Sequence, residues 1–185
     1  FKTGDDILFK RGGTFTGTNW YLKHGGTKSD PAIIGAYGSG AKPVFNSGVH
    51  IICTAQNIGY ITIQNIKLTN TGTGSAVFFN GGNLSNIIIS RVDVFNSSQN
   101  AIFLAAIDTY LIEDCYAKDF DNSGIVIYGS SKNPPITNGI IRNSVADGQG
   151  ANQDCFTIHK DSAGNDVGPN HLLINNTGSG CGEQA

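Results

Sequence analysis

The sequence has few charged residues, no methionine and no long apolar run. These absences exclude several classes of protein. Only 14% of its 185 residues are charged, and it has five prolines and one tryptophan. Its net charge is −2 and it lacks a basic run, which argues against a nucleic-acid partner. No apolar run is long enough for a membrane-spanning helix. No CxxC pair is present, so the four cysteines do not suggest a zinc site.

Glycine and β-branched residues are abundant instead. The 25 glycines, together with the many Ile, Val and Thr residues, predict an all-β chain with many turns. A chain of this length is sufficient for one domain with a sizeable core, so we expect a single domain over residues 1–185. The opening "FKTGDDILFKRGG" has no initiator Met and no signal peptide, and we interpret the chain as a piece of a longer, processed protein.

The sequence contains two families of repeated segments. One family is "ITIQNIKLTN" (61–70), "IIISRVDVFN" (87–96), "YLIEDCYAKD" (110–119), "GIIRNSVADG" (139–148) and "LLINNTGSG" (172–180). The other is "SAVFF" (75–79), "NAIFL" (100–104), "SGIVI" (123–127) and "DCFTI" (154–158). Alternating strands that recur in this way, without helical segments between them, predict a parallel β-solenoid whose coils stack to bury one apolar side.

Aligned repeats predict which residues lie above one another in successive coils. Three columns should point inward: Ile63, Ile89, Ile112, Ile141 and Ile174; Val77, Ile102, Ile125 and Phe156; Phe79, Leu104, Ile127 and Ile158. A kink inside each member of the first family should fall at Asn65, Arg91, Asp114, Asn143 and Asn176. Asn and Asp suit this position because their side chains bond local backbone and tolerate unusual dihedral angles.

Two motifs near the start of the chain carry a resemblance to a known family. "GDDILFKRGGTFTG", followed by "PAIIGAYGSGAKPVF", resembles the N-terminal part of the pectate-lyase-like right-handed β-helix superfamily, and "YITIQNIKLTN" is similar to its first standard coil. The resemblance implies a right-handed parallel β-helix of about five to seven coils, and a secreted or cell-surface protein. It leaves the activity open, because this superfamily includes polysaccharide lyases, glycoside hydrolases, uronan epimerases, phage tailspikes and adhesins.

The stretch "DCFTIHKD" (154–161) ends the second family with a run of polar residues. If Phe156 and Ile158 point inward, His159 points outward and lies next to Tyr128 of the preceding coil. Lys160 and Asp161 follow, beside the loop insertions "SSKNPP" and "SAGNDVGP". Long loops beside one face of a rigid scaffold often form the walls of a binding cleft.

These residue types suit β-elimination on a uronic-acid polysaccharide. The reaction needs a base, an acid for the leaving oxygen and a cation for the carboxylate. We assign His159 as base, Tyr128 as acid, and Lys160 with Arg142 to the carboxylate, and Lys160 could exchange roles with His159. Lys118 and Asp161 are further candidates for substrate contacts. The competing interpretation is that His159 is an ordinary solvated residue at a strand end.

Other interpretations of the charged residues stay open. Glu113 with Arg142, and Lys118 with Asp147, should be opposite charges one coil apart, and we favour plain cross-strand ion pairs. Calcium binding is left open. Its weak candidate ligands lie in one region of the chain, and their spacing does not match an EF-hand: Asp154, Asp161 and Asp166. Hydrolysis would need two carboxyl groups across one cleft, and its candidates are Asp147, Asp154 and Asp161.

Two functions therefore compete. The first is a polysaccharide lyase-like enzyme, with glycoside hydrolysis as the second choice of reaction. The alternative is a non-catalytic adhesin or fibre solenoid that binds glycans or serves as a scaffold. Outward Phe78 and Phe103 could form a sugar platform, but we favour a loop or a partner packed on them. In either case polysaccharide is the expected partner, and exposed strand edges predict end-to-end association or contact with further coils. Cys115 should be a buried hydrophobe, whereas pairing of Cys155 with Cys181 is left open.

Overall fold

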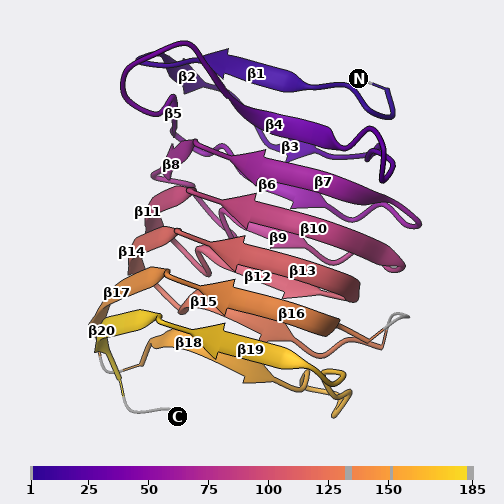
Figure 1. Cartoon of the computed structure of the whole chain (residues 1–185). Helices are drawn as coiled ribbons and strands as arrows, with labels where there is room; N and C mark the ends of the chain where they lie inside the picture. Colours follow the sequence, from indigo (N-terminus) through magenta and orange to yellow (C-terminus); the bar gives the residue numbers. More distant parts are fainter. Residues whose placement is uncertain (1, 132–134, 151, 183–185) are drawn as a thin grey trace.

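The computed structural model describes residues 2–131, 135–150 and 152–182, and in these ranges the chain is all β. The described residues form twenty strands in three parallel sheets that stack coil upon coil, as predicted (Figure 1). The sheets contain seven, seven and six strands, which agrees with the expected number of coils. None of the described segments is a helix that could cross a membrane.

Each of the first six coils contributes one strand to each sheet, and the last described coil contributes one strand to each of the first two sheets. The first sheet contains β1 (Ile7–Lys10), β4 (Ala32–Tyr37), β7 (Gly59–Gln64), β10 (Leu84–Ser90), β13 (Ile107–Glu113), β16 (Thr137–Arg142) and β19 (His171–Ile174). The second contains β2 (Thr14–Thr16), β5 (Val44–Asn46), β8 (Lys67–Thr69), β11 (Asp93–Ser97), β14 (Tyr116–Phe120), β17 (Val145–Gly150) and β20 (Thr177–Cys181). The third contains β3 (Trp20–Tyr21), β6 (Ile51–Cys53), β9 (Val77–Phe79), β12 (Ile102–Ala105), β15 (Ser123–Tyr128) and β18 (Asp154–His159).

The interior is filled by the predicted columns of side chains. In the first sheet Ile63, Ile89, Ile112 and Ile141 pair in register and are fully buried. The columns of the third sheet, from Val77 to Phe156 and from Phe79 to Ile158, are also in the predicted register. Cys115 is buried with a free thiol, as expected.

A single residue with positive φ turns the chain from the first sheet to the second. Asn65, Arg91, Asp114 and Asn143 occupy this kink with φ between 50° and 55°, as predicted. Asn and Asp adopt such angles at low cost, because their short polar side chains bond nearby backbone.

In the last coil the predicted register is wrong by one residue. The kink falls at Asn175, with φ of 51°, and not at Asn176. Ile141 therefore pairs with Leu173, and Ile174 lies on the outer face beside Arg142. The Asn176 side chain instead bonds the backbone of the preceding coil, accepting from Ser144 N at 3.0 Å and donating to the Ile141 carbonyl at 2.8 Å. These two bonds fix which of the consecutive asparagines makes the turn.

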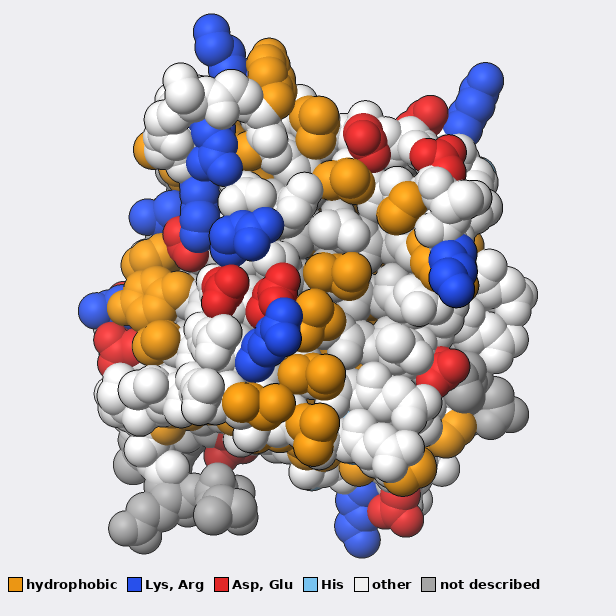
Figure 2. All heavy atoms as spheres, viewed as in Figure 1, with side chains coloured by type: hydrophobic (Ala, Val, Ile, Leu, Met, Phe, Trp, Pro, Cys, Tyr) orange, Lys and Arg blue, Asp and Glu red, His pale blue; other side chains and the backbone are white. Residues whose placement is uncertain are grey.

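The outer face of the first sheet carries a band of aliphatic side chains that crosses the strands (Figure 2). Its members occupy one register position in five coils: Ile33, Ile88, Leu111, Ile140 and Leu172. Most of these side chains are half-buried, and only Leu172, on the last strand, is mostly exposed, at 54%. This face lies on a different sheet from the cleft described next.

Candidate functional site

A cleft of about 560 Å³ lies along the outer face of the third sheet, over β12, β15 and β18. Its lining combines aromatic, aliphatic and small polar residues: Asn100, Phe103, Asn122, Ser123, Val126, Tyr128, Asp154, Phe156, Thr157, Ile158 and His159. A concave site with apolar walls and a few polar groups is the usual form of a small-molecule or sugar site. We therefore take it as the candidate functional site.

Stacked aromatic side chains form one wall of the cleft and extend beyond it. Phe78 and Phe103 pair in register on β9 and β12, and their ring centroids are 4.9 Å apart with an interplanar angle of 21°. The Phe103 ring is in turn 5.4 Å from that of Tyr128. The predicted Phe78–Phe103 stack is thus confirmed, and it continues into the next coil through Tyr128.

Tyr128 and His159 lie side by side at the ends of β15 and β18, as predicted. Their ring centroids are 4.5 Å apart and the rings meet edge to face at 85°. His159 Nδ1 is 2.7 Å from the Lys160 carbonyl oxygen. Because a carbonyl can only accept, Nδ1 donates in this contact. Nε2 is therefore the ring nitrogen that could act as the predicted base.

Small polar groups line the cleft at the starts of the same strands. Ser123 and Asp154 pair in register, and Asn122 precedes Ser123. Asp154 is the one carboxylate among the described residues of the lining, which includes no Lys or Arg. The cleft therefore carries negative charge, without a fixed cation to receive an anionic ligand.

Lys160 and Asp161 follow His159 and do not line the cleft. Lys160 is exposed. Asp161 organises its own loop, because its Oδ1 accepts from Ala163 N at 3.0 Å and Asn165 N at 2.8 Å, and its Oδ2 accepts from Asn165 Nδ2 at 2.8 Å. These bonds, led by the one from the Asn165 side chain, lower the pKa of Asp161.

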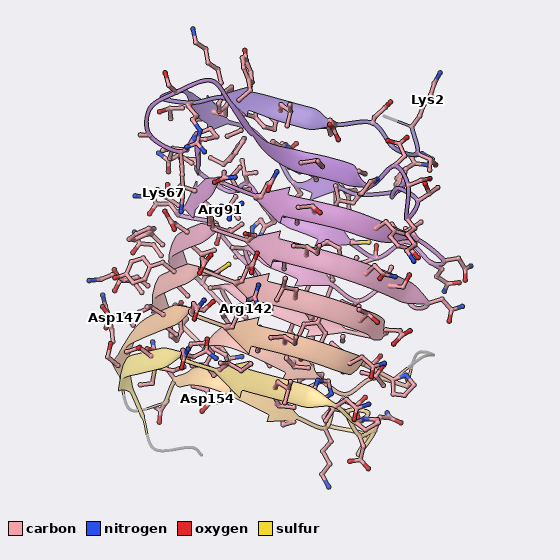
Figure 3. All side chains as sticks on the ribbon, viewed as in Figure 1. Lys2, Lys67, Arg91, Arg142, Asp147 and Asp154 are labelled. Atoms are coloured by element: carbon pink, nitrogen blue, oxygen red, sulfur yellow. A yellow bond between two sulfur atoms is a disulfide. The ribbon has the colours of Figure 1, made fainter. Side chains whose placement is uncertain are left out.

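Arg142 and Lys118 lie on the other two sheets, away from the strands that form the cleft. Figure 3 shows Arg142 on the first sheet and Asp147, the partner of Lys118, beside the second sheet. Arg142 Nη2 lies 2.6 Å from Glu113 Oε2, and Lys118 Nζ lies 3.4 Å from Asp147 Oδ2, so both predicted ion pairs form. The hydrogen bond from Arg142 lowers the pKa of Glu113, and that to Asp147 raises the pKa of Lys118.

The three acidic residues considered for calcium do not gather into one site. Asp154 lines the cleft, Asp161 bonds its own loop, and Asp166 lies further along that loop. Within the part of the chain that the structure describes, no three His, Cys, Asp or Glu residues lie close enough together to hold a metal ion.

One polar row in the cleft was missed from the sequence. Residues at the starts of the four third-sheet segments (Ser75, Asn100, Ser123 and Asp154) occupy one register position, and the last three line the cleft. The signal was present, because each repeated segment opens with a polar residue. The alignment of outward residues covers only later positions in these strands and therefore omits this row.

Comparisons with known proteins add no relative to this description. No protein family, curated protein or solved structure matched the chain. The geometry and chemistry of the cleft are therefore the basis for proposing a function.

Proposed function

We propose that the protein binds a polysaccharide along the outer face of its third sheet, with sugar rings seated in the cleft against Phe103 and Tyr128. The observation that carries the proposal is the row of aromatic rings leading into the cleft, with centroid distances of 4.9 and 5.4 Å. Aromatic side chains offer large apolar faces to the C–H faces of sugars, and adjacent hydroxyl and amide groups can bond sugar hydroxyls.

Neutral sugars fit this cleft better than uronates do. Its described lining has the Asp154 carboxylate and no basic side chain, so an anionic ring would meet like charge in a partly desolvated place. Arg142 and Lys118, the cations that could have held a uronate, are paired with Glu113 and Asp147 on other sheets. A neutral glycan needs no such partner.

Two further features support a polysaccharide ligand outside the cytoplasm. The motifs at residues 4–17 and 31–45 resemble those of the pectate-lyase-like superfamily, and we propose that the chain is a member. The disulfide between Cys155 and Cys181 supports an oxidising compartment, because such bonds are rare in the cytosol. We accordingly propose a secreted or cell-surface location.

Substitution of one aromatic residue in the cleft and of one outside it tests the proposal. Binding to a panel of neutral and acidic polysaccharides would be measured by affinity electrophoresis for the natural chain, Phe103→Ala and Phe95→Ala. Phe95 is a matched control, because it is also a half-buried outward aromatic but lies on the second sheet. We expect about tenfold weaker binding for Phe103→Ala and no change for Phe95→Ala. Equal binding by all three proteins would refute the proposal.

β-elimination is a second candidate, favoured by the contact between Tyr128 and His159. His159 Nε2 could take the proton next to a uronate carboxyl, and the Tyr128 hydroxyl could protonate the leaving oxygen. Of the described residues, Lys160 is the nearest basic group in sequence for the carboxylate role. Absorbance from unsaturated ends, measured on a panel of uronans, detects this reaction, and activity that survives in His159→Ala would remove His159 from it.

Hydrolysis has less support from the cleft. An inverting or retaining glycosidase uses two carboxyl groups on either side of the scissile bond. Asp154 alone supplies such a group among the described lining residues, since Asp147 pairs with Lys118 on the second sheet and Asp161 bonds its loop.

A further inference from the structure

Asn100 lines the cleft and has a buried side-chain oxygen without a hydrogen-bond partner among the described residues. The residue lies two positions before the third-sheet strand β12, lines the cleft and is only 6% exposed. Its Nδ2 donates to Ser75 Oγ at 3.0 Å, whereas its Oδ1 receives no hydrogen bond from any described residue. A buried polar atom without a partner is unfavourable, so a group that donates a hydrogen bond to it would be stabilising.

The backbone around Asn100 leaves the side chain little freedom to move elsewhere. The Asn100 carbonyl accepts from Ser97 Oγ at 2.8 Å and from Ala76 N at 3.0 Å, which ties the residue to its own turn and to the preceding coil. In the orientation that the structure shows, the oxygen end of this amide still needs a partner.

We propose that Asn100 is a specificity-determining residue of the cleft, whose side-chain oxygen accepts a hydrogen bond from one hydroxyl of a neutral sugar stacked on Phe103. This inference rests on the proposed glycan binding and adds to it the class of group recognised. An acceptor oxygen selects a donor, so a ligand hydroxyl is favoured over a carboxylate or phosphate. The Asp154 carboxylate in the same row has the same preference.

The aromatic wall and the polar row together define how the sugar is held. Phe103 lies three positions after Asn100, on the face that carries the stack, so a ring packed on Phe103 would present its edge toward the start of the strand. A site built to bond a particular hydroxyl strongly rejects an analogue that lacks it, because its buried group is then left unpaired. Asn100 would thus distinguish between sugars that Phe103 alone would bind equally.

Deoxy-sugar analogues test this role separately from overall affinity. The probes are hexasaccharides of β-linked glucose, mannose, xylose or galactose, and the best-bound one is then made in singly deoxygenated forms. Calorimetric titration compares the natural chain, Asn100→Ala and Ser75→Ala. The Ser75 variant is the matched control, because it removes the same internal hydrogen bond and keeps the Asn100 oxygen. Circular dichroism verifies folding, and Asn100→Leu, which also lacks an acceptor, replaces the alanine variant if that protein does not fold.

We expect one deoxy position to weaken binding to the natural chain and to Ser75→Ala about tenfold, and to have no effect on Asn100→Ala. The inference is overturned if Asn100→Ala keeps the same loss, or if all deoxy forms bind the natural chain equally. In those cases weaker binding by Phe103→Ala would still support glycan binding. Failure of every hexasaccharide and polysaccharide to bind the natural chain would overturn both proposals together.

Discussion

The rings of Tyr128 and His159 meet edge to face on successive coils of the third sheet, with centroids 4.5 Å apart. Tyr128 also packs against Phe103, so its ring is held from both sides. His159 is fixed by its own bond to the Lys160 carbonyl. The pair therefore forms a rigid end to the aromatic row. Different substitutions of Tyr128 can distinguish the role of its ring from the role of its hydroxyl.

Replacement of Tyr128 should affect binding and catalysis differently. Tyr128→Phe keeps the ring and should bind glycan within about twofold of the natural chain, whereas Tyr128→Ala should weaken binding about tenfold. If the cleft also carries out elimination, Tyr128→Phe should abolish that activity by removing the acid. Titration calorimetry and absorbance assays on the same preparations measure the two effects. Loss of binding in Tyr128→Phe would show that the hydroxyl, and not the ring, carries the affinity.

The ion pair of Glu113 with Arg142 should make stability depend weakly on pH. The pKa of Glu113 is lowered below 4.5 in the folded chain, chiefly by the hydrogen bond from Arg142. The pair therefore stabilises the fold above pH 4.5, and this contribution is lost as pH falls through the lower, folded-state pKa. We expect under about 1 kcal/mol, because the Arg142 side chain is 45% exposed. Urea unfolding from pH 7 to 3 should show a shallower decline for Glu113→Gln than for the natural chain, and identical slopes would contradict this.

Gly139 should be essential because Tyr110 occupies the space beside it. A Cβ at Gly139 would lie 1.8 Å from Tyr110 Cζ, and the ring is held by a 2.9 Å contact from its hydroxyl to His171 Nδ1. Gly139→Ala must therefore displace a buried ring, and we expect a loss of more than about 2 kcal/mol in the free energy of unfolding. Gly17→Ala is the control, because nothing lies within 4 Å of its added Cβ, and it should change stability by less than about 0.5 kcal/mol. Equal denaturation midpoints for the two variants would refute the packing argument.

The repeat pattern predicts most of this fold. Each coil has the same alternation of apolar and polar residues as the previous one, and because the coils stack, residues that are aligned in the sequence repeats are neighbours in the sheets. Ile63, Ile89, Ile112 and Ile141 are in one buried column for that reason. The wrong register in the last coil shows what an alignment of repeats cannot predict. With two consecutive asparagines, both positions suited the kink, and the choice depended on bonds between Asn176 and the coil above. Such bonds between coils are not visible in an alignment of repeats.

Contacts in the candidate site could be predicted from the sequence where they depend only on the register between neighbouring strands. Tyr128 and His159 share a register position, so their contact could be derived from the alignment. Arg142 was assigned to the same site as His159 on the basis of residue type, whereas the kink after each first-sheet strand places it on another face. Asn100 is the opposite case, since its importance comes from an unpaired oxygen, which depends on packing.

The disulfide should stabilise the last coil in particular. Cys155 and Cys181 join β18 to β20 across a sequence separation of 26 residues, and closing such a loop is worth about 3 kcal/mol. Reduction should therefore accelerate hydrogen exchange in β18 and β20 and leave β7 and β10 unchanged. Alkylation at pH 8 after reduction should label Cys155 and Cys181 before Cys53 and Cys115, because burial raises the pKa of both free thiols to about 12. Simultaneous labelling of all four would show that reduction unfolds the whole solenoid.

We expect the protein to associate through the edge of β19. Leu172, Leu173 and Ile174 are 54%, 48% and 41% exposed, and no described strand pairs with the far side of β19. Leu173 continues the inward column of Ile141, so another parallel strand stacked below it would bury this side chain and pair the open backbone groups.

We expect sedimentation velocity to show reversible, concentration-dependent association of the natural chain. Leu173→Lys should shift this association to higher concentration, because it places a charge at the stacking position. Tyr37→Lys, a change at a 50% exposed residue on β4, should have no effect. A natural chain that remains monomeric at high concentration would show that this edge does not associate.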